Sequence, residues 1–262
     1  MTAIAPEFVL ISLVIVFFGG TVKGLVGFGA NVTGTVLLAQ FLDPSTAVVF
    51  MILPALLSSF PLILTLNLNG LKECLCRFYP LIIAATVGAF LGTLFQNSVP
   101  APALRIFLGF VVVGYVLLQQ HRFKLPSFTD DGYLEHCFSD YNIVKVFMGL
   151  ISGTVFGSSN VGIQTVVYLD RLDLSHSVFI GVMSMYFVNL SAARLMAALY
   201  NGMFPQGVLA ISVVASLFGV FGVLAGMASR KLVSDRYVHL SVLLFLFVAG
   251  LRLVTSGVLT AL

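Results

Sequence analysis

Four basic residues lie inside apolar stretches of this sequence, where a membrane helix ordinarily carries no charge. They are Lys23, Arg105, Arg194 and Arg252. All ten carboxylates lie instead in polar loops or at the edges of apolar stretches. A charge at membrane depth costs about 2.5–3.5 kcal/mol on insertion scales, so such a residue generally marks a pathway or a site. Positive charge at depth without carboxylates predicts that an anion binds, and argues against a cation carrier or a carboxylate proton relay.

The segment around Lys23 carries a second signal. Residues 20–34 read GTVKGLVGFGANVTG, with five glycines inside an otherwise apolar run. Glycine weakens a helix, and irregular backbone at membrane depth is tolerated only where it is buried or lines a cavity. We therefore expect a helix break here, with a second helix starting near Ala30. The run FMGLISGTVFGSSNVGIQTVVYL predicts a similar break near Val161.

Each break would expose the N-terminus of a short helix, which carries partial positive charge and free N–H groups. Such a terminus is suited to bind an anion. The candidate substrate-binding residues are Lys23, Gly29, Asn31, Thr33, Ser158, Ser159, Asn160, Gln164 and Arg194. We predict no catalytic residues and no metal site.

The polar candidates around the breaks also have structural interpretations. Asn31 and Asn160 are of the residue type that caps helix N-termini well. The nearby serines and threonines, and Gln164, can satisfy backbone groups that the break frees.

The basic candidates have structural interpretations too. Lys23 can cap the C-terminal carbonyls of the first helix. Arg194 can extend outward to the membrane surface, as long basic side chains do. Arg105 and Arg252 lie nearer the ends of their stretches and are expected to be interfacial anchors.

Composition determines the class of fold. The chain of 262 residues is 59% hydrophobic and only 9% charged, with a mean hydropathy of +1.09. A soluble chain of this size could not bury so much apolar surface, so we predict an all-α polytopic membrane protein. The apolar stretches are Phe8–Phe41, Thr46–Leu66, Phe78–Gln96, Ala103–Gln120, Ile143–Leu169, Val178–Tyr200, Gly207–Ala228 and Val238–Leu259.

Two halves of the chain resemble each other. Gly24-Leu25-Val26, leading to Asn31-Val32, parallels Gly153-Thr154-Val155, leading to Asn160-Val161. The pattern L-D-x-S-x-x-V follows in both halves. Matches in the same order at nearly the same offset predict an internal repeat. We expect a single membrane domain, with repeat one over 7–120, a cytoplasmic linker over 121–142 and repeat two over 143–262.

The remaining Lys and Arg residues predict the topology. If the first and fifth stretches each enter the membrane and return to the same face, all these residues lie on one side. Cytoplasmic loops collect Lys and Arg, so this arrangement is favoured over eight single crossings. It gives two inverted repeats, each a broken re-entrant hairpin followed by three transmembrane helices. Both termini then lie on the outer side of the membrane.

Several segments together resemble the TauE/SafE family. These are GTVKGLVGFGANVTG, LDPSTAVVFMILP, FMGLISGTVFGSSNVGIQTVVYL, YFVNLSAARL and FVAGLRLV, so the resemblance covers nearly the whole chain. It implies a bacterial inner-membrane exporter of sulfite or organic sulfonates. The chain departs from the family pattern at Ser158–Gly162, where Gly-Gly-Pro is usual, and at Thr33–Thr35, where a proline is usual.

We therefore predict a transporter, not an enzyme, that exports sulfite or an organic sulfonate through a midplane site between two half-helix N-termini. The alternative is an anion channel or importer for another small sulfur-containing or carboxylate anion. A membrane enzyme or thiol-redox carrier would need paired cysteines, metal ligands or a nucleophile–base set, and the sequence shows none of them. The expected partners are a small anion and the lipid bilayer, with no cofactor and no nucleic acid; a homo-oligomer is possible.

Overall fold

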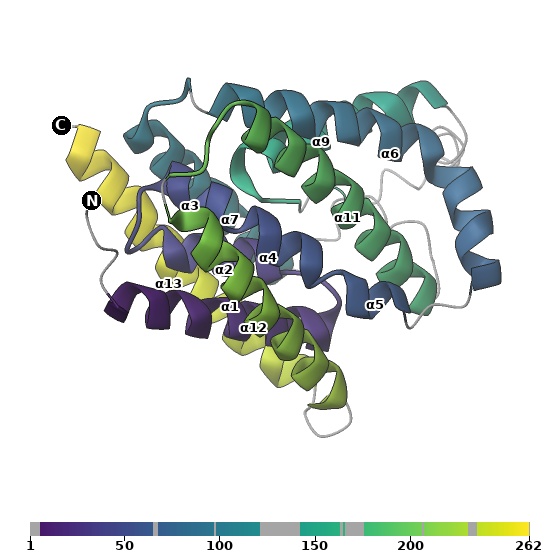
Figure 1. Ribbon diagram of the computed structural model, residues 1–262, viewed down its shortest axis with the longest axis horizontal. Coiled ribbons are helices and arrows are strands. Elements are labelled where there is room, and N and C mark those ends of the chain that lie inside the picture. The colour runs from purple at the N-terminus through teal and green to yellow at the C-terminus, as the bar shows by residue number, and fades with distance from the viewer. Residues whose placement is uncertain are drawn as a thin grey trace.

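The computed structural model describes residues 6–64, 68–96, 98–120, 142–162, 165, 176–205, 207–229 and 235–261. Regular structure in this part of the chain is entirely helical (Figure 1). The helices are α1 (Pro6–Val26), α2 (Ala30–Leu38), α3 (Pro44–Phe50), α4 (Ile52–Leu57), α5 (Phe60–Leu64), α6 (Leu68–Gln96), α7 (Ala101–Gln120), α9 (Asn142–Ser159), α11 (His176–Tyr200), α12 (Val208–Ser229) and α13 (Asp235–Ala261). The predicted all-α fold is confirmed.

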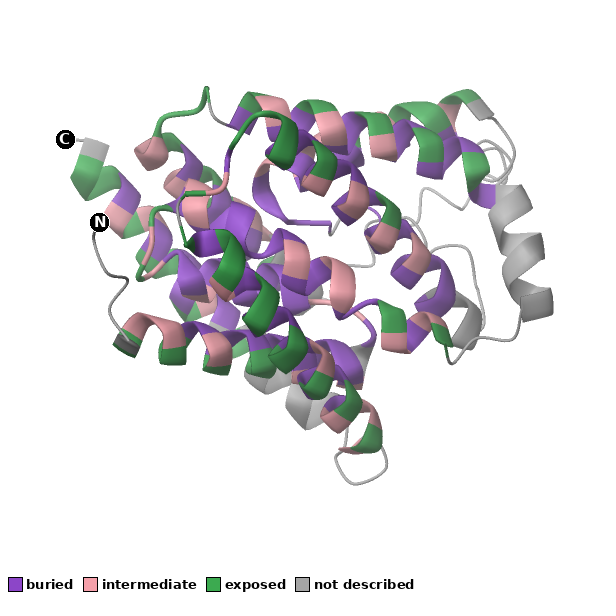
Figure 2. Cartoon of the chain, in the orientation of Figure 1, coloured by how far each residue is buried: buried purple, intermediate pink, exposed green. Residues whose placement is uncertain are grey.

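In the part of the chain that the structure describes, five helical segments are long and apolar enough to cross a membrane. They are Glu7–Leu25, Pro44–Leu64, Phe78–Gln96, Ile180–Tyr200 and Val208–Ser229. Large apolar side chains such as Leu10, Phe95 and Phe221 are more than 60% exposed. Exposed residues recur along the outer helices of the bundle (Figure 2). So much exposed apolar surface is suited to contact with lipid. The start of α1 and the end of α13 lie on the same side of the molecule (Figure 1).

The first apolar stretch is broken where the glycines predict it. α1 ends at Val26, and the linking residues Gly27 and Gly29 have φ angles of 93° and 99°. This left-handed conformation costs an ordinary residue about 1–2 kcal/mol, so glycine is favoured. The N–H of Gly27 donates to the carbonyl of Lys23 at 2.7 Å and closes the last turn of α1. α2 then begins at Ala30, as expected.

The first arm of this hairpin is a long helix. α1 has 21 residues, which corresponds to about 30 Å and matches the thickness of a bilayer core. The break therefore follows a helix that is long enough to cross that core. Gly19, Gly20 and Gly24 remain helical because the backbone of a neighbouring helix lies against each of them. α2 is shorter, with nine residues.

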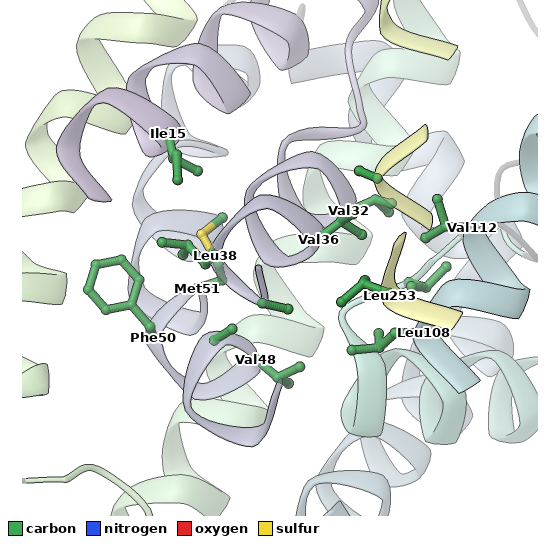
Figure 3. Packing of buried hydrophobic residues seen from close by; sticks show 14 of the residues in the cluster. Ile15, Val32, Val36, Leu38, Val48, Phe50, Met51, Leu108, Val112 and Leu253 are labelled. Carbon is green, nitrogen blue, oxygen red and sulfur yellow. The ribbon is translucent and has the colours of Figure 1, made fainter. Parts of the chain in front are cut away.

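α2 lies in the centre of the bundle. Every residue of α2 except Leu37 is buried. Its side chains Val32 and Val36 pack between Ile15 of α1 and Leu253 of α13, within the largest cluster shown in Figure 3. A helix enclosed in this way positions its polar residues deep inside the protein.

The two halves of the chain pack across each other. α1 contacts α12, α9 contacts α6, and α7 contacts α13. A Cβ added at Gly222 of α12 would overlap the carbonyl of Phe17, and one added at Gly88 of α6 would overlap the carbonyl of Leu150. Backbones that meet this closely need glycine, as in the small-residue interfaces of membrane helices. The first helix of each predicted repeat thus packs against the other repeat.

Candidate functional site

Arg194 of α11 is completely buried. Its Nη1 donates to the side-chain oxygen of Asn160, its Nη2 to the carbonyl of Val48 at 3.4 Å, and its Nε to Thr93 Oγ1 at 3.4 Å. The ring of Phe156 lies beneath the guanidinium, with its centroid 5.3 Å from Cζ. Arg194 therefore does not extend to the membrane surface, and that interpretation is wrong. All of these partners are neutral.

Asn160 links this guanidinium to the broken hairpins. It follows the end of α9 with φ 62°, and its N–H donates to the carbonyl of Phe156 at 2.9 Å. Its Nδ2 donates to Thr35 Oγ1 of α2 at 2.9 Å and to the carbonyl of Val48 at 3.0 Å. Asn160 thus terminates the first arm in the left-handed conformation that asparagine tolerates. The N-cap interpretation of Asn160 is wrong.

Lys23 has a separate set of partners. Its side chain is 1% exposed, and Nζ donates to Ser59 Oγ at 2.5 Å, to Ser58 Oγ at 3.2 Å and to the carbonyl of Ala55 at 3.4 Å. These groups lie at the junction of α4 and α5. Lys23 therefore does not cap the carbonyls of its own helix, and these three hydrogen-bond partners are also neutral.

The start of α2 offers unsatisfied polar groups. Gly29 occupies the N-cap position and supplies no side-chain hydrogen bond. The N–H groups ahead of Thr33 have no partner within the helix, as at any helix start. Within the described chain, Asn31 Oδ1 and Thr33 Oγ1 are buried without a hydrogen-bond partner. Asn31 lies inside the first turn, so its interpretation as the N-cap is also wrong.

The serines at the second break bond to their own helix. Ser158 Oγ donates to the carbonyl of Thr154 at 3.1 Å, and Ser159 Oγ donates to that of Val155 at 2.6 Å. Ser159 also accepts a bond from the N–H of Val161 at 3.2 Å. These contacts agree with the structural interpretation of both serines. Gln164 lies outside the described residues.

The charge at these sites is not balanced by carboxylates. Among the described residues, neither Lys23 nor Arg194 forms an ion pair, whereas Arg105 pairs with Asp43 at 3.6 Å. Arg252 is exposed, and Arg105 is partly exposed, in agreement with their expected place at the interface. A buried charge without a counter-charge is costly unless a ligand supplies one.

The candidates form two groups and not one. The Arg194 cluster contains Arg194, Asn160, Thr35, Thr93, Phe156 and the Val48 carbonyl; the Lys23 cluster contains Lys23, Ser58, Ser59 and the Ala55 carbonyl. The clusters come nearest along the chain at the carbonyls of Val48 in α3 and Ala55 in α4. These residues are about two helical turns apart, or roughly 10 Å at 1.5 Å per residue. Asn31 lies one turn before Thr35 on the same face of α2.

Some residues of these networks were not predicted. Ser58 and Ser59 carry a weak signal, because two adjacent hydroxyls stand inside an apolar stretch. Thr93 and Tyr186 carry none, since each lies in a stretch where it could equally face a neighbour or lipid. Tyr186 bonds to Ser152 at 2.9 Å and to Thr165 at 2.8 Å, and so joins α11 to both sides of the second break.

In a comparison with protein families, the chain matches a family described as "Sulfite exporter TauE/SafE". It covers residues 12–253, which is nearly the whole chain and includes both clusters. Searches of curated proteins and of solved structures found no match. A chain matched over this length, with helices suited to a membrane and buried positive charge, belongs to the TauE/SafE family of sulfite exporters.

Proposed function

We propose that this protein exports sulfite or an organic sulfonate and that the anion binds at the Arg194 cluster. The observation that carries this proposal is the completely buried guanidinium with neutral partners alone among the described residues. An oxyanion would supply the missing counter-charge. Membership of an exporter family supports the substrate class.

The chemistry of the cluster suits a sulfur oxyanion. A guanidinium presents N–H donors in a fixed plane that can bind two oxygens of one anion. Asn160 fixes the orientation of Arg194 and ties it to Thr35 on α2. Asn31, one turn away, lies at a helix start whose free N–H groups and dipole favour negative charge. Thr33 carries a buried hydroxyl that can donate to an oxygen of the anion.

The transport pathway is proposed from the same elements. Two inverted repeats with broken hairpins, and both termini outside, would let the anion pass between helix breaks that enter from opposite faces. An inside-negative membrane potential would then drive the anion outward. Because α1 is long enough to cross the membrane core, we propose that its break lies beyond the centre of the membrane. The two breaks would then not meet at a single point at the midplane.

A binding series tests the proposal on purified protein in detergent. The thermal unfolding midpoint is measured with sulfite, sulfate, sulfoacetate and taurine for the wild type, for Arg194→Gln and for the exposed control Arg252→Gln. We expect sulfite and sulfoacetate to stabilise the wild type and the control but not Arg194→Gln. Equal stabilisation of Arg194→Gln would place the anion elsewhere. A response to sulfate alone would overturn the substrate class.

A further inference from the structure

The first helices of the two halves share a short sequence string. Residues 20–24 read GTVKG, and residues 153–157 read GTVFG. The threonines of the two strings make the same contact. Thr21 Oγ1 donates to the carbonyl of Phe17 at 3.0 Å, and Thr154 Oγ1 donates to that of Leu150 at 2.8 Å. Lys23 therefore has Phe156 as its counterpart.

The helix ends follow the same register. Gly27 and Asn160 both have positive φ angles, of 93° and 62°. Each closes its helix by donating to the fourth residue before it, Lys23 in one half and Phe156 in the other. This register differs by about one turn from the sequence alignment that paired Asn31 with Asn160. In the structure, Asn160 corresponds to Gly27.

The cross-half contacts also agree with this register. A Cβ added at Gly226 of α12 would overlap the carbonyl of Thr21, and one added at Gly92 of α6 would overlap that of Thr154. The two helix pairs, α1 with α12 and α6 with α9, thus meet through matching positions. Three features therefore place Lys23 and Phe156 at corresponding positions of the two halves. They are the shared sequence string, the helix ends and the glycine contacts between the halves.

Lys23 and Arg194, the two most deeply buried cations among the described residues, lie at corresponding contacts in this arrangement. Lys23 on α1 faces Ser58 and Ser59, in the segment that follows the first broken hairpin. Its counterpart Phe156 on α9 faces Arg194, on the helix that follows the second break. Each half therefore holds one cation at the contact between these two elements. The cation comes from the first helix in one half and from the later helix in the other.

We propose that Lys23 is a second anion contact, the counterpart of Arg194 in the other half, so that the transported anion meets one buried cation in each half. This inference rests on the proposed function. The clusters contact α3 at Val48 and α4 at Ala55, about two helical turns apart, so one small anion contacts them in sequence and not together. Lys23 then serves as a second binding position along the anion pathway, and its role depends on a positive charge at that position.

The test rebuilds in the first half the arrangement of the second half, with an aromatic residue on the first helix and the cation on the later segment. Flux of a sulfonate is measured in liposomes for wild type, Lys23→Met, Lys23→Phe, and Lys23→Phe with Ser59→Arg. The double variant sets a guanidinium facing an aromatic ring, as Arg194 faces Phe156. We expect both single variants to lose about tenfold or more of the flux, as for loss of a charged contact, and the double variant to recover most of it.

The outcomes separate this inference from the proposed function. Normal flux in Lys23→Met would overturn the role of Lys23, while loss of flux in Arg194→Gln would still support the Arg194 site. A double variant that folds, by gel filtration and thermal unfolding, but stays as slow as Lys23→Phe would also overturn it. If Lys23→Phe does not fold, Lys23→Met alone decides, because Met fills nearly the same volume without charge.

Discussion

Arg194 donates a hydrogen bond to Asn160, the residue that ends α9. The buried guanidinium of α11 is therefore oriented by the residue at which the second helix break begins. Asn160 also donates to Thr35 on α2, so the same side chain couples both broken hairpins. A movement of either break would move the guanidinium that we propose as the anion contact.

Replacing Asn160 by Asp tests this coupling. The change places a carboxylate against the guanidinium, which would neutralise Arg194 and repel an incoming anion. We expect sulfonate affinity to fall about tenfold or more, while the protein still folds because aspartate also tolerates positive φ. Binding is measured by thermal shift, with Asn201→Asp in the exposed turn after α11 as the control. Wild-type affinity in Asn160→Asp would show that the anion does not reach Arg194.

The glycine contacts between halves predict a stability pattern. Gly222→Ala and Gly88→Ala should each destabilise the protein by about 1–3 kcal/mol, since the added methyl group overlaps a backbone carbonyl of the neighbouring helix. Gly114→Ala should be neutral or stabilising, because no heavy atom lies within 4 Å of its added Cβ. Thermal unfolding in detergent measures all three. Equal midpoints for the three variants would contradict this packing.

The topology predicts which cysteines a membrane-impermeant reagent can reach. Cys137 lies outside the described residues and in the proposed cytoplasmic linker, so it should react only in inside-out vesicles. A cysteine introduced as Gly202→Cys, in the exposed turn between α11 and α12, should react in intact cells. The two reactions are compared in Cys137→Ser and wild-type backgrounds. Labelling of Cys137 in intact cells would rule out the two-hairpin topology.

The energy source for export is predicted to be the membrane potential. The described spans contain no buried carboxylate to carry a proton. A potential contributes about 2.3 kcal/mol per charge for each 100 mV, enough to concentrate a monovalent anion roughly fiftyfold. Flux of a sulfonate in liposomes should therefore reverse when a potassium–valinomycin potential is reversed. Flux that ignores voltage and follows a pH gradient would show coupling to a proton instead.

Part of this structure follows from local sequence. Hydropathy identifies the spans because each span is a continuous apolar run, and the glycines between Lys23 and Ala30 identify the break because a left-handed residue there needs glycine. The partners of Lys23 and Arg194 do not follow, since they depend on how helices distant in sequence pack. The roles of Asn31 and Asn160 were mistaken for a related reason. An asparagine near a break can start a helix or end one, and only the backbone conformation separates the two.

Sulfonate flux through Arg194→Gln in liposomes tests the role of the buried cations most directly. Wild-type protein should carry the anion in the direction set by the potential. Arg194→Gln should carry about tenfold less or lower, while it keeps the gel-filtration profile of the wild type and while Arg252→Gln carries the anion normally. Wild-type flux through Arg194→Gln, or no flux above protein-free liposomes for the wild type, would contradict anion transport through this site.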